Sequence, residues 1–182
     1  MTTEEITSAA ISWLFRTGYS VAAEIGVGCY RGGIASECIA KARRLDLVGL
    51  KDDGSTIGVE VKATRPDLLG DRKMHLYHQW VERLYLAVPK DLATEGGQVA
   101  GSLKCGLLIV APSTYNPKRL IADAVRRGTR QRIKPGAWMD LIMAMALRSG
   151  NPRYCPNCGS APSQKPMNGG RGDQEREVSD GA

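Results

Sequence analysis

Two acidic residues and a lysine lie in two short, strand-like runs of the sequence, "RRLDLVGL" and "TIGVEVKA". They are Asp46 in the first run, and Glu60 and Lys62 in the second. Because an unpaired charge is costly to bury, these residues lie either on a solvated face or in a functional site. Two nearby carboxylates can bind Mg²⁺, and an ammonium beside them can stabilise charge that develops on a phosphate. Ordinary cross-strand ion pairs on a partly exposed strand would use the same residue types, so that alternative stays open.

The segment "KDDGS" between the two runs decides which residues face one another. A two-residue loop would place Asp46 and Glu60 on different faces of the hairpin. A three-residue loop with Gly54 in the left-handed conformation places Asp46 directly opposite Glu60. The hydrophobic pattern favours this second register, because it separates apolar from charged residues. One face then carries Leu45, Leu47, Ile57, Val59 and Val61, and the other carries Arg44, Asp46, Gly58, Glu60 and Lys62.

The rest of the chain supplies elements that would position this hairpin. "TTEEITSAAISWLF" has apolar residues at helical spacing and a capping box of Thr2 and Glu5, which predicts a helix that ends at Gly18. "RLYLAVP" and "CGLLIVAP" are almost continuously apolar, as in strands buried on both faces. Residues 90–104 between them form either a helical crossover or an ordered loop. We also expect a strand over 19–27 and helices over about 68–82, 117–127 and 136–148.

The composition predicts one soluble domain. The chain has 182 residues, of which 42% are hydrophobic, and its five cysteines are odd in number, unlike a secreted disulfide framework. No stretch approaches the roughly 18 consecutive apolar residues of a membrane span, and the beginning is acidic where a signal peptide is basic. We therefore expect a cytoplasmic protein without membrane contact. It would comprise a domain over 1–150, a Cys-x-x-Cys segment over 151–162 and a disordered tail over 163–182.

The charge of the chain favours a polyanionic partner. The formal net charge is +6, and the acidic tail after residue 163 leaves the remainder more positive still. Nucleic acid is such a partner, although a solubilising surface would have the same composition. The run "RRGTRQRIK" contains no acid and is expected to contact the phosphate backbone without sequence specificity, unless it is a charged loop at a helix end. Its candidate contacts are Arg126, Arg127, Arg130 and Arg132.

The order of acids and lysine resembles the signature of the PD-(D/E)XK nuclease superfamily, an Asp on one strand and Glu-x-Lys on the next. The surrounding segments "RRLDLVGL", "VEVKATRPDLLGDRK", "ERLYLAVP" and "GLLIVAP" are similar to the MmcB-type DNA-repair proteins of that superfamily, over roughly residues 5–148. The resemblance implies an α/β fold with a restriction-endonuclease-like αβββαβ core, in which helices flank a mixed central sheet. It also implies a phosphodiesterase that uses Mg²⁺ or Mn²⁺ and acts on DNA in repair, recombination or the processing of mobile elements.

The resemblance also assigns roles to individual residues. Asp46 and Glu60 match the metal-binding acids, and Lys62 matches the catalytic lysine. We add the backbone carbonyl of Val61 as a further ligand. The additional acid that many members contribute is assigned to Glu24, with Glu37 as the fallback.

Basic and aromatic residues follow the motif at positions that resemble a cluster on the next helix. Arg72 and Lys73 would contact phosphate, and Tyr77 would hydrogen-bond or stack. Arg44 belongs to the charged face of the hairpin and is a further candidate. A solvated helix face with one aromatic at the edge of the core is the alternative for the helix residues.

The segment "YCPNCGS" places Cys155 and Cys158 at the spacing of half a zinc ribbon. A structural zinc site needs four ligands, and no second such pair follows. Cys29 and Cys38 would have to fold back to complete the site, or a homodimer would have to share zinc between two tails. A redox or incidental thiol pair is the alternative.

The sequence thus predicts a metal-dependent DNA nuclease. A catalytically inactive nucleic-acid-binding accessory module with the same fold is the main alternative. A protein in which Asp46 and Lys62 form only a structural ion pair is the third. The DNA structure that is recognised, and endonuclease or exonuclease action, stay open.

Overall fold

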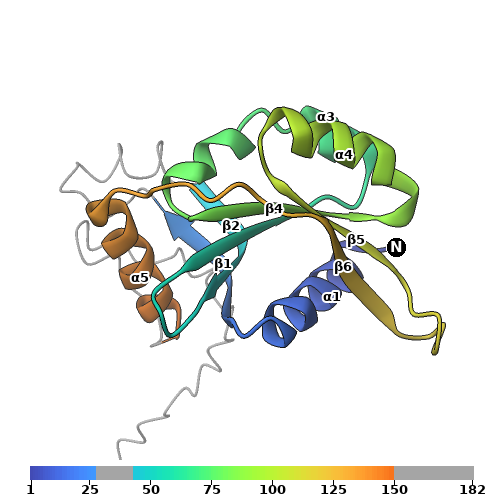
Figure 1. Ribbon diagram of the computed structural model, residues 1–182, viewed down its shortest axis with the longest axis horizontal. Coiled ribbons are helices and arrows are strands. Elements are labelled where there is room, and N and C mark those ends of the chain that lie inside the picture. The colour runs from blue at the N-terminus through green and yellow to red at the C-terminus, as the bar shows by residue number, and fades with distance from the viewer. Residues whose placement is uncertain (28–42, 150–182) are drawn as a thin grey trace, which may run out of the picture.

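The computed structural model describes residues 1–27 and 43–149. Its centre is a six-stranded sheet in the order β1-β2-β3-β4-β5-β6, with helices on both faces (Figure 1). Neighbouring strands are antiparallel from β1 to β3, parallel from β3 to β5 and antiparallel between β5 and β6. The mixed sheet confirms the expected α/β fold. The strands are β1 (Ser20–Val27), β2 (Arg43–Leu50), β3 (Thr56–Val61), β4 (Arg83–Pro89), β5 (Gly106–Pro112) and β6 (Leu120–Arg126).

Helix α1 (Thr3–Arg16) covers one face of the sheet, below it in Figure 1. Its expected capping box is confirmed: the Glu5 N–H donates to Thr2 Oγ1 (3.2 Å), and the Thr2 N–H donates to Glu5 Oε2 (2.7 Å). The helix buries one apolar stripe against β-strand residues such as Leu47 and Val59. The buried positions are Ile6, Ala9, Ala10, Trp13 and Leu14.

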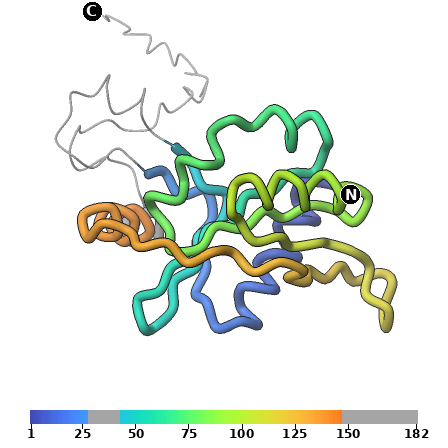
Figure 2. Tube along the Cα trace, turned by 45° about the horizontal axis from the view of Figure 1, so that its top comes forward, coloured from blue at the N-terminus to red at the C-terminus, as the bar shows by residue number. Residues whose placement is uncertain are grey.

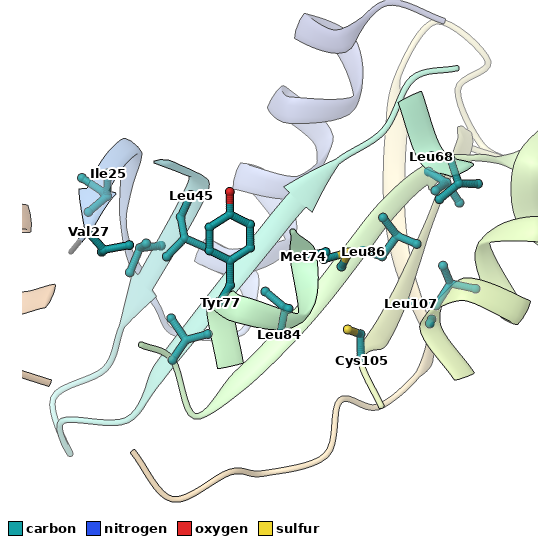
Figure 3. Packing of buried hydrophobic residues seen from close by; sticks show 14 of the residues in the cluster. Ile25, Val27, Leu45, Leu68, Met74, Tyr77, Leu84, Leu86, Cys105 and Leu107 are labelled. Carbon is teal, nitrogen blue, oxygen red and sulfur yellow. The ribbon is translucent and has the colours of Figure 1, made fainter. Parts of the chain in front are cut away.

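The opposite face is covered by several helical elements. The elements are α3 (Arg65–Gly70), the 3-10 helices η1 (Met74–Gln79) and η2 (Lys90–Leu92), α4 (Ala93–Ser102) and α5 (Pro135–Ser149). Their side chains and those of the sheet form a second apolar cluster, the η1-side cluster, which includes Leu68, Met74, Leu84 and Leu86 (Figure 3). Because both faces are covered, a charged side chain on either face of β3 lies inside the protein.

Two crossovers join the three parallel strands. Parallel neighbours need a connection that crosses the sheet, and it is commonly helical. α3 and η1 lie between β3 and β4, and η2 and α4 lie between β4 and β5. The helical alternative for residues 90–104 is therefore the correct one.

Two of the expected helices are wrong. Residues 117–127 contain the edge strand β6, paired with β5 through positions such as Val110 and Ala122, rather than a helix. Tertiary pairing along the open edge of β5 decides this segment against its helical periodicity. The helix expected over 68–82 is interrupted after Gly70, where the Asp71 carboxylate accepts a hydrogen bond from the Lys73 N–H (2.8 Å). This local bond competes with helix continuation.

The three-residue hairpin loop is confirmed. Gly54 has φ +80°, its N–H donates to the Lys51 carbonyl (2.9 Å), and the Lys51 N–H donates to the Ser55 carbonyl (3.0 Å). The paired positions run from Leu50 with Thr56 to Leu47 with Val59. The next positions in this register are Asp46 and Glu60.

The expected separation of faces is wrong at Leu45. Leu45 belongs to the η1-side cluster and lies against Gly58, whereas Leu47 packs toward α1. The alternation breaks between them at Asp46, where side-chain hydrogen bonds replace the backbone pairing of β2 with β3. The Asp46 N–H donates to Glu60 Oε1 (3.3 Å), and the Val61 N–H donates to Asp46 Oδ2 (2.8 Å).

Candidate active site

Asp46 and Glu60 lie side by side at the point where β2 and β3 stop pairing through their backbones. Each carboxylate accepts a backbone N–H of the other strand, Asp46 from Val61 and Glu60 from Asp46. These reciprocal bonds hold both side chains in fixed orientations. The structure thus brings together the two acids that the sequence places opposite one another.

Burial makes two negative charges at this position unfavourable. Glu60 is 3% exposed, and burial, followed by the nearby Asp46 charge, raises the pKa of Glu60 from 4.5 to about 8. Burial also raises the pKa of Asp46, although the Val61 N–H and the Lys62 charge oppose that rise. Two repelling, desolvated carboxylates retain a proton or attract a cation.

Lys62 supplies one cation to this pair. Its side chain is only 10% exposed, and its ammonium lies 2.7 Å from Asp71 Oδ2, 3.6 Å from Asp67 Oδ1 and 3.9 Å from Glu60 Oε2. Burial would lower the pKa of Lys62, but the hydrogen bond and charge of Asp71 outweigh it and raise that pKa. Lys62 is therefore held as a charged group beside Glu60.

The sequence predictions did not include Asp71 and Asp67, the two acids around Lys62. Thr64 caps α3 by accepting the Asp67 N–H (3.4 Å), and Pro66 lies in the first turn. The helix is short, so Asp71 follows at its end and turns toward Lys62. The spacing of four residues between the two acids would place them on one helical face, and this was the available signal.

The Asp71 carboxylate is itself stabilised as an anion. Burial alone would raise the pKa of Asp71, but the bond from Lys62, aided by backbone N–H groups of Lys73 and Met74, lowers it. Asp71 and Lys62 therefore form a charged pair at the edge of the acid site.

Tyr77 has a structural position in this site. It is 7% exposed and reaches from η1 toward β2, where its hydroxyl donates to the Arg44 carbonyl (2.9 Å; Figure 3). Burial, with smaller contributions from the acids Glu60, Asp71 and Asp46, raises the pKa of Tyr77, so the phenol stays neutral. The ring is enclosed and fixes β2, rather than presenting a face on which a base could stack.

Glu24 lies on β1 opposite Asp46 of the neighbouring strand β2. Its position falls between two paired positions, Ala23 with Leu47 and Ile25 with Leu45. Its φ of 53° breaks the regular strand, and its exposed carboxylate lies 3.4 Å from the Arg44 guanidinium. Among residues 1–27 and 43–149, no three His, Cys, Asp or Glu side chains form a group that could hold a metal. Glu24 is thus near the site, but the structure does not bring it together with Asp46 and Glu60. The fallback acid, Glu37, lies outside the described residues.

The donor set nevertheless fits a hard divalent cation. The two carboxylates supply oxygen ligands, which Mg²⁺ prefers, and Mg²⁺ commonly binds one or two carboxylates while keeping water and phosphate ligands. The Val61 N–H points toward Asp46, and N–H and C=O of one strand residue point to the same side, so the Val61 carbonyl lies at the same strand edge. A cation here would also relieve the repulsion between Asp46 and Glu60.

An open cavity of about 540 Å³ gives access to Lys62 from the surface. Asp67, Asp71, Arg72 and Lys73 also line it, and both basic residues are exposed. The structure therefore places these two predicted phosphate contacts next to Lys62.

The run from Arg126 to Lys134 lies at the other end of the parallel strands. Gly128 accepts a hydrogen bond from Arg83 at the start of β4, and the Gln131 N–H donates to the Glu82 carbonyl (2.7 Å). Lys62, in contrast, follows the end of β3, where its N–H donates to the Ala87 carbonyl (3.0 Å). The chain after β6 then continues across the molecule to α5 (Figure 2). The structure thus separates the predicted basic contacts into two groups, of which Arg126, Arg127, Arg130 and Arg132 are distant from the acids.

The remaining predicted ligands, Cys155 and Cys158, lie outside the described residues. Within the described part of the chain, no helix is both long enough and apolar enough to cross a membrane.

The sequence pattern of the MmcB-like DNA repair protein family matches residues 21–152, more than two thirds of the chain. The chain belongs to this family. The matched range contains Asp46, Glu60, Lys62 and the acids around Lys62.

Two solved structures similar to this MmcB-like chain are each described as a protein of unknown function. One is protein SPO1766 of Silicibacter pomeroyi, described as of unknown function, with 23% identity and a TM-score of 0.62 over 82% of this chain and 87% of that chain. Another is a protein of unknown function, AF1548, with 12% identity and a TM-score of 0.39 over 57% and 56% of the two chains. No curated protein matches the chain. The first likeness shows that the fold is shared.

Proposed function

We propose that this MmcB-like protein is a metal-dependent nuclease that hydrolyses phosphodiester bonds of DNA during repair. The observation that carries the proposal is the pair of half-buried Asp46 and buried Glu60 with the Lys62 ammonium beside it. Lys62 lines a cavity together with two exposed cations, Arg72 and Lys73, and this supports a phosphate substrate. The resemblance to the PD-(D/E)XK superfamily, and membership of a DNA repair family, agree with this function.

In this proposal, Asp46, Glu60 and the Val61 carbonyl would hold Mg²⁺ or Mn²⁺. When bound, the ion supplies Lewis-acid polarisation of the scissile phosphate and lowers the pKa of a bound water. Lys62 places a positive charge 3.9 Å from Glu60, where it stabilises negative charge that develops on the phosphate.

Asp71 acts on this chemistry through Lys62. It orients the ammonium through a short contact of 2.7 Å and keeps it protonated. We therefore propose Asp71 as a positioning residue. Arg72 and Lys73 bind neighbouring phosphates at the rim of the cavity.

A DNA-binding accessory module without catalysis is the second candidate. Two observations favour it. Both carboxylates of the acid pair already accept hydrogen bonds from backbone N–H groups, and among the described residues no third acid joins them in a group that could hold a metal. Such a protein would bind DNA through its two groups of cations and leave it intact.

Cleavage of supercoiled, linear and single-stranded DNA in Mg²⁺, Mn²⁺ or EDTA distinguishes the two candidates. The nuclease should cut in the presence of metal and lose activity in EDTA. Lys62→Met keeps most of the buried aliphatic volume but removes the ammonium, so cleavage should fall about 100-fold or more.

The matched control is Lys118→Met, which removes an exposed lysine from the turn between β5 and β6. It should cleave like the wild type. Salt-dependent binding with no metal-dependent cleavage would establish the accessory module, and cleavage that survives both EDTA and Lys62→Met would rule out the proposed mechanism.

A further inference from the structure

A second cavity, of about 430 Å³, lies between the end of η1 and the segment that leads into α5. Trp80 forms one wall, and Arg132, Lys134 and Asp140 contribute the charged groups of its lining. Ile133 and Ala137 are apolar neighbours in the same lining. The volume lies in the range of small-molecule sites, about 300–1,000 Å³.

The walls of this cavity are held in place by hydrogen bonds. The Gln131 N–H donates to the Glu82 carbonyl (2.7 Å), which ties the basic segment to the start of β4. The Trp138 indole N–H donates to the Gly54 carbonyl (3.0 Å), which ties α5 to the hairpin loop. The cavity is therefore already formed without a ligand, so binding would need little ordering of the protein.

Trp80 has an unused polar group. Its indole nitrogen is buried and has no hydrogen-bond partner among the described residues. Its ring packs against the η1-side cluster. A buried donor without an acceptor is unfavourable, and native proteins leave few of them. Because that nitrogen is closed off from solvent, Trp80 offers the cavity its ring rather than its N–H, and a ligand with an aromatic face would complement this ring.

We propose that this cavity binds an unpaired nucleotide of DNA. Its base would stack on Trp80, and its phosphates would contact Arg132 and Lys134. A base inside a duplex has both faces covered by its neighbours, so only an unpaired base can enter the cavity and stack. An inorganic anion alone would make no use of the Trp80 ring. The inference rests on the proposed DNA substrate, but it does not require cleavage.

The position of the cavity suggests which DNA would occupy it. Glu82, two residues after Trp80, donates its N–H to Thr56 Oγ1 (3.1 Å), so the cavity lies near the start of β3. Lys62 lies six residues beyond Thr56, about 20 Å at 3.3 Å per residue. That span corresponds to about six base-pair steps of 3.4 Å. The substrate class is therefore a duplex with an unpaired extension, with the duplex near Lys62 and the extension in the cavity.

Binding in EDTA tests this inference separately from cleavage. The probes are a fluorescein-labelled oligothymidylate, a blunt duplex, and the same duplex with a short single-stranded overhang. We expect the overhang to bind more tightly than the blunt duplex. Trp80→Ala should weaken oligothymidylate and overhang binding roughly 5- to 100-fold and leave blunt-duplex affinity within about twofold.

Two further variants guard against an unfolding effect of Trp80→Ala. Trp80→Phe keeps a stacking ring and should retain most single-strand affinity, and its thermal midpoint shows whether the wall stays folded. Arg132→Ala with Lys134→Ala should weaken single-strand binding more than Lys118→Ala with Arg119→Ala, a matched loss of two exposed charges in the turn between β5 and β6.

Equal affinity for the overhang and the blunt duplex would overturn the inference. So would a Trp80→Ala protein that is folded and binds oligothymidylate like the wild type, which would also be the result if a segment of the chain itself filled the cavity. Absence of cleavage by the wild type would instead refute the nuclease proposal and leave these binding results intact.

Discussion

The two ends of the parallel strands carry ion pairs that look alike but have different surroundings. At the end of β3, the Lys62 ammonium lies 2.7 Å from Asp71, and its side chain is 10% exposed. At the start of β4, the Arg130 guanidinium lies 3.0 Å from Glu82, and its side chain is 62% exposed. Water screens the second pair, so it contributes little to stability, whereas breaking a buried pair leaves an uncompensated charge.

This difference distinguishes the end of the sheet proposed for catalysis from the end proposed for DNA binding. Desolvation raises the pKa values of Glu60 and Asp46. It also strengthens the electrostatic interactions of these carboxylates with nearby charges. The cations of residues 126–134 instead lie at the surface, where they can exchange counterions for phosphates. We therefore expect substitutions at the first end to change catalysis and pH dependence, and substitutions at the second end to change affinity and salt dependence.

Asp46→Asn should produce the largest effect. The amide oxygen of Asn can still accept the Val61 N–H, so the fold is kept, but a charged metal ligand is lost. We expect metal-dependent cleavage to fall about 100-fold or more. DNA affinity in EDTA should stay near the wild-type value. At the other end, Arg127→Ala should cleave normally at saturating DNA, and a comparable loss of turnover in this variant would erase the contrast between the two regions.

Glu60 should make the stability of the metal-free protein depend on pH. Because the pKa of Glu60 is raised to about 8 when folded, the folded state keeps a proton that the unfolded state releases above about 4.5. Stability should therefore fall as pH rises through this window, by up to about 1.4 kcal/mol per pH unit. Glu60→Gln should flatten that slope, measured by urea unfolding in EDTA.

Glu82→Gln is the matched control for this measurement, because Glu82 pairs with the exposed Arg130 at the other end. It should leave the slope unchanged. Mg²⁺ should reduce the slope of the wild type, since a bound cation favours the charged Glu60. A wild-type slope that is flat in EDTA would contradict the burial argument.

Asp71→Asn should lower cleavage about tenfold by releasing Lys62. Burial lowers the pKa of Lys62 and Asp71 opposes this, so the variant should lose the charged ammonium at lower pH than the wild type. The alkaline limb of the pH–rate profile should then move to lower pH. Asp67→Asn is the comparison, because that carboxylate is 3.6 Å away and 53% exposed, and its effect should be smaller. Equal pH–rate profiles for the two variants would contradict the proposed positioning role of Asp71.

The smallest effects should come from the exposed cations. Arg126→Ala with Arg127→Ala should weaken DNA binding a few-fold and reduce the slope of log affinity against log salt by up to about 2, without changing turnover. Arg72→Ala with Lys73→Ala should reduce the slope similarly but also lower turnover, because these residues line the cavity at Lys62. If both double variants changed only affinity, the cavity at Lys62 would not be the place of cleavage.

Several features of this protein follow from its sequence because they depend on neighbouring residues. Gly54 and the alternating pattern of the two strands determine the hairpin register, and Thr2 with Glu5 determines the start of α1. The apolar runs of β4 and β5 indicate strands covered on both faces. The pairing of Asp46 with Glu60 follows from these local rules.

Only the tertiary structure decided how these charges are used. Helices on both faces bury Glu60 and Lys62, and the short α3 brings Asp71 to Lys62, which no strand periodicity specifies. The pairing of β6 with β5 overrides a helical pattern, and it carries the basic run to the end of the sheet opposite Lys62. Desolvation and the distance between charges depend on contacts between residues remote in the chain, so the sequence names the charged groups while the fold determines their pKa values and their neighbours.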